Sequence, residues 1–600
     1  MKSRSDAAAA AVLYAAVAIV WTWPLALGLT RNLPADYGDP LLNCWILTWD
    51  VTHLGPGWWN ANIFFPHPLA LAYSEHLWPQ ALQIAPIYAL TRNPILCYNL
   101  LFLSTFVVAG VGMYLLAREL TGHSAGALVA GLAFAFAPYR VSALPHVQVL
   151  SSGWMPLALF GFRRYFVARN PRALVGGAAA WTVQNLSCSY YLLFFSPVVA
   201  IYLLWELITR RRSIGSRDLI VIGISVALVV VATVPFVLPY VELRRMGFGP
   251  RTDVARFSAD TYAYFTADPH VRMWGSIARA FSKPEGALFP GVTTTVLAIA
   301  GARAPLALAP LALFAVPLLA LRVPLIHVTS LAHDFVWIAA VCAAWFAASP
   351  PERRRLGAWL TSPAAILAVM TVFAIAMSFG PDITARGRFL TDHTPYALFY
   401  RYVPGFDGLR VPARYAAIVT LGLAALGSMA IRTTRAAAIA GALIVVESWP
   451  APILINQNDT AYAQRHLRPL PDYVSVDSSR DLYDSIARLR PTAVVELPLG
   501  EAAFDVRYMF FSTRHWTPLV NGYSGGVPLD YVQLSEALED ALTQPDRAWE
   551  QLRATGASHV VVHENAYESN LGRDLTAWLR SRGAVEIASF GSDRVLRLKN

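Results

Sequence analysis

The stretch LCYNLLFLSTFVVAGVGMYLLA (96–117) carries no charged side chain and, as a helix, is long enough to cross a lipid bilayer. A helix satisfies its backbone polar groups internally, which hydrocarbon requires. The run DLIVIGISVALVVVATVPFVLPYV (218–241) has the same character, with one acid at its start. These runs predict a fold built on membrane-spanning helices.

The same criterion, runs of roughly 17–25 apolar residues, predicts thirteen spans along the chain. They are 7–29, 96–117, 123–138, 147–168, 172–189, 190–209, 218–241, 287–302, 304–321, 334–348, 362–379, 411–431 and 435–452. The stretch 77–91 is apolar but contains two prolines. We interpret it as an interfacial or re-entrant helix, with a further span as the alternative.

Composition agrees with a membrane protein. Of the 600 residues, 56% are hydrophobic and 14% are charged, whereas soluble domains run at about 45–50% and about 25%. Four cysteines, far apart, exclude a disulfide framework and a cysteine metal site. The use of 45 arginines and three lysines, with much alanine, indicates a GC-rich bacterial genome.

Charge placement predicts the orientation of the spans. With the N-terminus in the cytoplasm, the inner side holds 17 basic and five acidic groups, and the outer side of residues 1–452 holds 16 and 14. Cytoplasmic loops carry the excess of basic residues, so this orientation is favoured. An odd number of spans then places the tail outside. The three long loops, 30–95, 242–286 and 380–410, also lie on the outer face.

The tail differs from the body. Residues 1–452 carry 33 basic and 19 acidic groups, and residues 453–600 carry 15 and 19. Within the tail we predict strands at 492–500, 516–525 and 557–563 and a hairpin over 585–600 that turns at Gly591-Ser592, and helices at 481–491, 535–544 and 568–583. This alternation predicts a small extracytoplasmic α/β domain over 453–600, beyond a membrane domain over 1–452.

The first outer loop, 30–95, is the richest in reactive side chains. In ADYGDPLLNCWILTWD (35–50), Asp39 stands where a helix N-cap belongs, before Pro40. Apolar residues at helical spacing predict a helix along the membrane surface. Capping alone explains Asp39. It does not explain Asp36, or Glu75 and His76 at the far end of the loop, so we treat all four as candidates for catalysis or binding.

A second group of polar residues stands at the outer ends of predicted spans. Polar groups at membrane depth are costly and suggest function, although an arginine can also reach out to lipid headgroups. Guanidinium groups suit a phosphate because they are permanently charged and bind it bidentately. The candidates for phosphate binding are Arg140, His146, Arg410 and Arg414, with Gln148, Tyr190, Tyr191 and Glu285 beside them.

The layout resembles the GT-C superfamily of integral-membrane glycosyltransferases, which use lipid-phosphate-linked sugar donors. The resemblance covers the whole chain, from the large first outer loop to the external C-terminal domain. In detail GDPLLNCWILTWD, NIFFPHPLALAYSEH, PYR with HVQ, and GLRVPAR look like uncharacterised bacterial proteins near this superfamily. The first loop has no adjacent Asp-Glu pair and no DxD motif, which leaves the subfamily open.

The resemblance implies transfer of a sugar from a polyprenyl-phosphate donor to a glycan, lipid or protein acceptor, at the outer face of the bacterial cytoplasmic membrane. It implies a first-loop carboxylate, Asp39 with Asp36 second, as general base in an inverting displacement. No organic cofactor is implied, and a divalent metal is left open. The tail lacks the basic and aromatic clusters that nucleic acid requires. The alternatives are a transporter or flippase of lipid-linked precursors, which predicts charges near mid-membrane, and a non-catalytic cell-envelope assembly protein.

Overall fold

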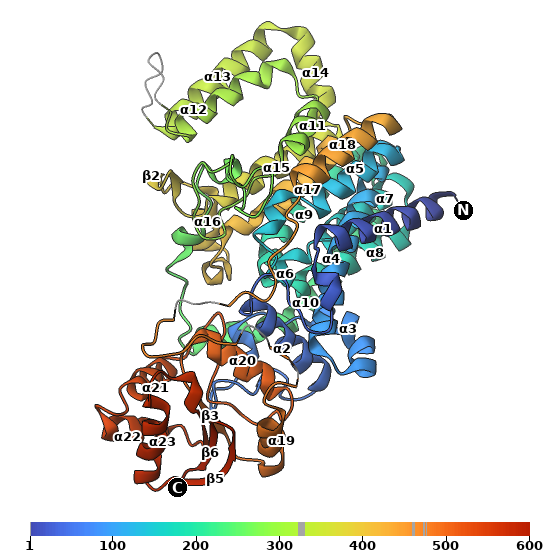
Figure 1. Cartoon of the computed structure of the whole chain (residues 1–600). Helices are drawn as coiled ribbons and strands as arrows, with labels where there is room; N and C mark the ends of the chain where they lie inside the picture. Colours follow the sequence, from blue (N-terminus) through green and yellow to red (C-terminus); the bar gives the residue numbers. More distant parts are fainter. Residues whose placement is uncertain (1, 322–329, 459–461, 472–473, 476, 600) are drawn as a thin grey trace.

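The computed structural model describes residues 2–321, 330–458, 462–471, 474–475 and 477–599. A large bundle of helices leads into a smaller part that contains a sheet and the C-terminus (Figure 1). The bundle and its loops contain α1 (Lys2–Trp21), α2 (Asp39–Thr52), α3 (Trp78–Thr91), α4 (Pro94–Thr121), α5 (Ser124–Ala135), α6 (Val147–Leu150), α7 (Trp154–Ala168), α8 (Pro171–Ser187), α9 (Ser189–Thr209), α10 (Ser216–Arg245), α11 (Val292–Ala302), α12 (Ala315–Leu318), α13 (Leu331–Ala348), α14 (Pro350–Leu360), α15 (Pro363–Ser378), α16 (Pro395–Tyr402), α17 (Ala416–Ser428) and α18 (Thr434–Glu447).

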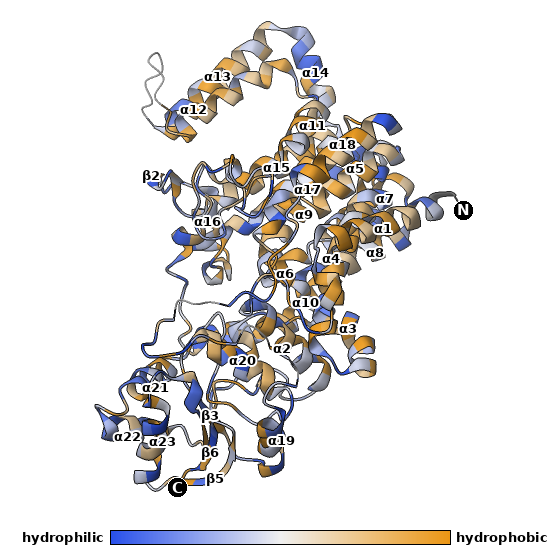
Figure 2. Ribbon diagram, viewed as in Figure 1, coloured by the Kyte–Doolittle hydropathy of each residue, from blue (hydrophilic) through white to orange (hydrophobic). Residues whose placement is uncertain are grey.

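Several of these helices can cross a membrane. Among the described residues five helices are long and apolar enough, and the pair α14 and α15, bent by 80°, makes up to six. Figure 2 shows apolar residues along the bundle helices and a mixture of polar and apolar residues in the C-terminal part. The chain is therefore a multi-pass membrane protein.

The observed helices are shorter than many of the predicted spans. The region 147–168 divides into α6 and α7, and 304–321 folds largely as a 3-10 helix, Leu306–Phe314, that contains Pro310. Proline removes a backbone donor and interrupts an α-helix. The helix α3 covers the stretch 77–91 in 14 residues, short of a full bilayer crossing. The number thirteen stays a prediction.

Ion pairs between helices bring predicted inner residues of α1, α4, α7, α9 and α10 together, whereas the Glu352–Arg355 pair lies within α14. The five acids assigned to the inner side each contact an arginine assigned to the same side. The pairs are Asp6–Arg118, Glu119–Arg164, Glu206–Arg163 with Glu206–Arg210, Asp218–Arg169 and Glu352–Arg355, at 2.7–3.3 Å. Such pairs require both partners at the same depth. Which leaflet these residues face stays a prediction.

The helix α2 is buried within the protein, although its apolar pattern suggested a helix with one exposed side. Every residue from Pro40 to Asp50 is buried, and α2 packs against α3, α4 and α20 (Ala502–Ser512). The helix is therefore covered by protein, including α20 of the tail, and its position along the membrane surface stays a prediction.

The tail is built on a four-stranded mixed sheet, as the predicted α/β domain requires. The strands are β3 (Val494–Leu497), β4 (His559–His563), β5 (Val585–Phe590) and β6 (Asp593–Arg597), in the order β3-β4-β6-β5. β3 and β4 are parallel, and β4–β6 and β5–β6 are antiparallel, with the predicted hairpin between β5 and β6. The tail helices are α19 (Arg480–Leu489), α20, α21 (Leu529–Glu539), α22 (Pro545–Ala554) and α23 (Leu571–Ser581).

Two sequence predictions within the tail are wrong. The stretch 516–525 is no strand and makes a single bridge, Leu519 with Val494. Trp516 has a positive φ of 52°, and the Asn521 side chain bonds both backbone groups of Glu496, where a strand would use its own backbone. The helix predicted at 535–544 ends at Glu539.

The three long loops and the tail pack together into one body. The backbone amides of Phe64 and Phe65 donate to the carbonyls of Asn521 and Leu519. In the other two loops, Asp260 accepts from the backbone of Arg386 and Gly387 beside a small hairpin, β1 (Ile383–Ala385) and β2 (Arg388–Thr391). One buried hydrophobic cluster runs from the bundle into the tail. The domain boundary at residue 452 stays a prediction.

Candidate functional site

Asp39 begins α2, one position further into the helix than predicted. Gly38 occupies the cap position, and Asp39 and Pro40 form the first turn. Asp36 Oδ1 accepts from the Gly38 backbone amide at 2.8 Å, and a Cβ atom on Gly38 would stand 3.0 Å from that oxygen. Asp36 thus shapes the turn that presents Asp39, and the close approach favours glycine at position 38.

The Asp39 carboxylate has a partner on each oxygen. Tyr523 donates its hydroxyl to Oδ1 at 3.1 Å, and His146 Nε2 lies 3.1 Å from Oδ2. Burial alone would raise the pKa of Asp39, but the hydrogen bond and charge of His146, the charge of Arg414 and the Tyr523 hydrogen bond together lower it. The Asp39 side chain is still 27% exposed, so the ionised carboxylate is accessible.

His146 comes from the turn before α6 and faces α2. Its side chain is 18% exposed. Burial would lower the pKa of the imidazole, but its hydrogen bond to Asp39 and the charges of Glu285 and Asp39 raise it. The two groups therefore form a carboxylate–imidazolium pair at mildly acid pH.

A second ion pair lies beside the first. The Arg414 guanidinium donates from Nε and Nη2 to the two oxygens of Glu285, at 2.7 and 2.9 Å. Arg414 also stacks on the Tyr190 ring, 4.4 Å from its centroid. Burial would raise the pKa of Glu285, but the charges of Arg414 and His146 outweigh it, so the pKa is lowered. Asp39, His146, Glu285 and Arg414 form one alternating set of charges, which we call the Asp39 cluster.

Arg410 differs from Arg414 in its partners. Its guanidinium stacks on Phe257, 4.5 Å from the ring centroid, and lies close enough to Tyr523 for its charge to act on that hydroxyl. Among the described residues, no acid forms an ion pair with Arg410. It is therefore a cation beside the Asp39 cluster that is available to an anionic ligand, whereas Arg414 is occupied by Glu285.

Comparison with solved structures shows that the chain has a known fold. An arabinofuranosyltransferase, AftD, from Mycobacteria superposes with a TM-score of 0.55 at 13% identity, over 99% of this chain and 41% of that one. The fold is that of the GT-C glycosyltransferases. This chain spans less than half the length of that transferase.

Two further structures are less similar. ArnT from Cupriavidus metallidurans, bound to undecaprenyl phosphate, has a TM-score of 0.40 at 14% identity, over 98% of this chain and 97% of that one. An oligosaccharyltransferase from Archaeoglobus fulgidus has a TM-score of 0.43 at 12% identity, over 93% of this chain and 67% of that one. No family model and no curated protein matches the sequence.

Within the GT-C fold, three further predicted residues support the Asp39 cluster. Glu75 is buried and accepts from the Ser189 backbone amide at 2.8 Å, at the start of α9. Burial raises its pKa, against the charge of Arg414. Gln148 Oε1 accepts from Asn43 Nδ2 at 3.4 Å, one turn along α2 from Asp39. Tyr190, under Arg414, holds that guanidinium in place.

Three other predicted residues have different surroundings. Arg140 is fully buried, donates to Ser152 Oγ and the Leu150 carbonyl, and lies over the Phe106 ring. His76 lies among tryptophan and phenylalanine rings, and burial lowers its pKa to about 3. The Tyr191 hydroxyl donates to the Val149 carbonyl at 3.0 Å. The structure does not bring these three into the Asp39 cluster.

The carboxylates and imidazole of the Asp39 cluster are potential metal ligands. Within the described part of the chain, no group of three or more His, Cys, Asp or Glu side chains is arranged to hold an ion. Asp39 is engaged by Tyr523 and His146, and Glu285 by Arg414. These residues do not fit a divalent cation.

Sequence reasoning missed Tyr523. It lies in NGYSGG (521–526), a segment of the tail that the sequence patterns assign to a strand and not to the site. Burial and the negative charge of Asp39 raise its pKa, so the hydroxyl keeps its proton and donates. The turn-rich glycine and asparagine composition was the available signal that this segment is a loop.

Proposed function

We propose that the chain is a membrane glycosyltransferase that moves a sugar from a polyprenyl-phosphate donor to an acceptor hydroxyl at the outer face of the bacterial cytoplasmic membrane. The observation that carries the proposal is the accessible Asp39 carboxylate, paired with His146, beside an arginine without an acidic partner among the described residues. The GT-C fold supports the proposal. The membrane-spanning helices also support it, because they put the protein in the bilayer where a lipid-linked donor would lie.

Arg410 is the residue that we assign to the donor phosphate. A guanidinium binds phosphate oxygens bidentately and neutralises the charge that grows as the anomeric bond breaks. Arg414 instead donates from Nε and Nη2 to Glu285, and its positive charge acts on Asp39 and His146. This division refines the prediction that either arginine holds the phosphate.

Asp39 is the residue that we assign as general base. Each of its oxygens accepts one hydrogen bond in the structure and has a further lone pair for an acceptor hydroxyl. The acceptor oxygen forms a bond to the anomeric carbon as the bond from that carbon to the phosphate oxygen breaks. The hydroxyl proton passes to Asp39, and the polyprenyl phosphate leaves with the bonding electrons. One such displacement inverts the anomeric centre.

The acceptor is a glycan, lipid or protein hydroxyl, and the tail is placed to approach it. Tyr523 brings the tail into direct contact with Asp39, and the backbone of 519–521 is bonded to the first outer loop. The tail therefore both completes the hydrogen bonding of the base and covers α2 from the outside.

The decisive experiment is Asp39→Asn in the purified full chain, assayed for release of polyprenyl phosphate from candidate donors. We expect a loss of about 100-fold or more, the usual contribution of a general base. Asp50→Asn is the matched control, because Asp50 lies on the same helix and its oxygens accept from Trp58 Nε1 and the Leu77 amide instead.

The outcomes separate the alternatives. Turnover by Asp39→Asn at the wild-type rate, with the protein folded, would contradict the assignment of Asp39. A wild type that cleaves no donor but moves labelled lipid-linked sugar across vesicles would favour the transporter. Loss of cell-envelope assembly without either activity would favour the scaffold.

A further inference from the structure

A cavity of about 690 Å³ lies at the end of the bundle away from Asp39. Three helices connect the two ends. α17 begins beside Arg414 and ends at Ser428, which lines the cavity, about 20 Å away at the rise of a helix. α4 ends at Thr121 and α15 begins at Pro363 on the same cavity. The cavity is therefore separate from the candidate active site, and it sits at the end that the ion pairs identify as the predicted inner side.

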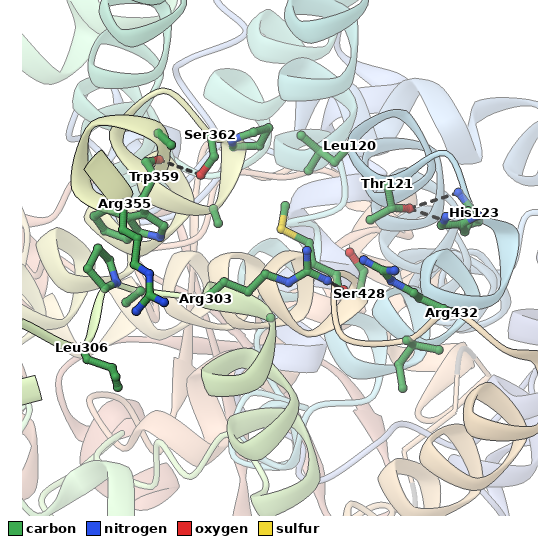
Figure 3. A pocket seen from close by; sticks show the side chains of 18 residues that line it. Leu120, Thr121, His123, Arg303, Leu306, Arg355, Trp359, Ser362, Ser428 and Arg432 are labelled. Carbon is green, nitrogen blue, oxygen red and sulfur yellow. Dashed lines mark hydrogen bonds between the residues drawn. The ribbon is translucent and has the colours of Figure 1, made fainter. Parts of the chain in front are cut away.

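Positive charge dominates the lining. Figure 3 shows the side chains of Arg303, Arg355 and Arg432 along the cavity, which His123 also lines. Among the described residues that line it, none is acidic. A hollow with several cations and no lining anion is complementary to an anionic ligand.

The three arginines are not equally engaged. Arg355 donates to Glu352 Oε1 at 2.7 Å. Arg303 donates from Nη2 to the Met429 carbonyl at 3.3 Å, a neutral acceptor. Arg432 forms no ion pair with any described acid. Two of the three guanidinium charges therefore lack a counter-charge in the described part of the protein.

Apolar side chains make up another part of the lining, together with the hydroxyls of Thr121, Ser362 and Ser428. Leu120, Trp359 and Ile431 contribute side chains to the wall. Leu306, at one edge, is 62% exposed. Pro363 and Ala364, at the start of α15, also line the cavity. Pro363 has no backbone N–H, the Ala365 amide donates to the Ser362 carbonyl at 3.1 Å, and the Ser362 hydroxyl donates to the Trp359 carbonyl. A helix N-terminus adds a favourable field for an anion.

We propose that this cavity binds the phosphate of an anionic phospholipid from the leaflet opposite the catalytic one, with the phosphate between Arg303 and Arg432 and the acyl chains over the apolar edge at Leu306. The general excess of arginine at this end accounts for the number of cations. It does not account for their convergence on a hollow that has both a cationic and an apolar side, which is the pattern of a lipid headgroup pocket. The proposal is independent of the proposed glycosyl transfer.

The test is lipid binding by the purified full chain, measured by native mass spectrometry. The probes are phosphatidylglycerol and phosphatidylcholine with the same acyl chains. The variant is R303A/R432A, and both arginines are exposed, so the protein should fold. The matched control is Arg353→Ala, an exposed arginine on α14 that does not line the cavity.

We expect the wild type and Arg353→Ala to retain phosphatidylglycerol over phosphatidylcholine, and R303A/R432A to bind phosphatidylglycerol about tenfold or more weakly. Equal affinity of R303A/R432A and wild type for phosphatidylglycerol, at equal melting temperature, would overturn the proposal. Should R303A/R432A unfold, Arg432→Ala alone, with Arg432→Lys retaining binding, gives the same comparison.

A final arm separates lipid from soluble ligand. Inorganic phosphate is added to the wild type and to R303A/R432A, and the melting temperature is followed. Protection of the wild type by phosphate, without any preference for phosphatidylglycerol, would show that the occupant is a soluble phosphate compound and that the lipid assignment is wrong. Preference for phosphatidylglycerol that is lost only in R303A/R432A supports the proposal.

Discussion

The Tyr523 hydroxyl donates to Asp39 Oδ1 at 3.1 Å across 484 positions of the chain. This contact joins the tail to the first turn of α2. His146, from the turn before α6, holds the other oxygen of the same carboxylate. The candidate base is thus assembled from three distant parts of the chain, and its ionisation depends on all three.

Tyr523→Phe tests whether the tail tunes the base. The hydroxyl lowers the pKa of Asp39, so its removal should raise that pKa. A hydrogen bond to a charged group contributes about 1.5–3 kcal/mol. A pKa shift of one unit corresponds to about 1.4 kcal/mol. We expect the acid limb of the kcat/KM profile to move upward by about one unit, measured as release of polyprenyl phosphate.

The control for Tyr523→Phe is Tyr462→Phe, since the Tyr462 hydroxyl accepts from the Leu470 amide within the tail. Its profile should keep the wild-type acid limb. A Tyr523→Phe profile that falls uniformly at all pH values would mean that Tyr523 acts only as a structural contact.

The Asp39–His146 pair predicts a pH window for stability. The pKa of Asp39 is lowered from its ordinary value of 3.8, so its contribution is present above 3.8 and is lost as pH falls through the folded value. The pKa of His146 is raised above 6.5, so its contribution is complete below 6.5 and is lost as pH rises through the folded value. His146→Gln should therefore lower the melting temperature more at about pH 6 than at about pH 9.

His393→Gln is the comparison for that measurement. His393 is 90% exposed and its contact with Asp392 is in solvent, where ion pairs contribute little. It should show a small effect at both pH values. An effect of His146→Gln that does not vary with pH would indicate that the imidazole is neutral in the folded protein.

The Glu285–Arg414 pair predicts strong coupling between two substitutions. Arg414 is 8% exposed and Glu285 is 21% exposed, and two hydrogen bonds join them. Removing one partner of a buried pair costs about 3–5 kcal/mol, and the partial exposure here places the loss at about 3 kcal/mol. We expect Arg414→Gln alone to destabilise by that amount in denaturant unfolding.

The double variant E285Q/R414Q should recover most of that loss, because no charge is then left without its partner. Strictly additive losses would show that the two side chains contribute independently. In that case Glu285 and Arg414 are not energetically coupled.

The sequence predicted the parts of this structure that depend on local patterns. The five acids and the arginines that they contact were assigned to the same side because both lie next to long apolar runs, although no pairs were predicted. Asp39 could be placed at a helix start because Asp-Pro is a local signal. The β5–β6 hairpin was likewise marked by its turn at Gly591.

The remainder could not be predicted because it depends on contacts across the chain. Arg140 was a candidate because of its predicted depth in the membrane, but depth does not determine the contacts of a side chain. In the structure Arg140 donates to the Leu150 carbonyl and lies over the Phe106 ring. Tyr523 reaches Asp39 only after the tail has packed on the first loop. Amphipathic spacing predicted the helix α2 but not its packing partner α20, which lies about 450 residues further along the chain.

Substitution of Arg410 should distinguish binding of the donor from the chemical step. Its guanidinium lies 4.5 Å from the Phe257 centroid, and among the described residues no acid pairs with it, so it is open to the donor phosphate. Arg410→Ala should raise KM for the lipid-linked donor about tenfold or more, with Arg410→Lys intermediate because lysine keeps the charge but not the bidentate geometry. Arg256→Ala is the matched control, since Arg256 lies over the same Phe257 ring at 5.5 Å and is exposed. If both alanine variants raise KM alike, the effect comes from the loss of packing on Phe257, and the phosphate must be held by another cation.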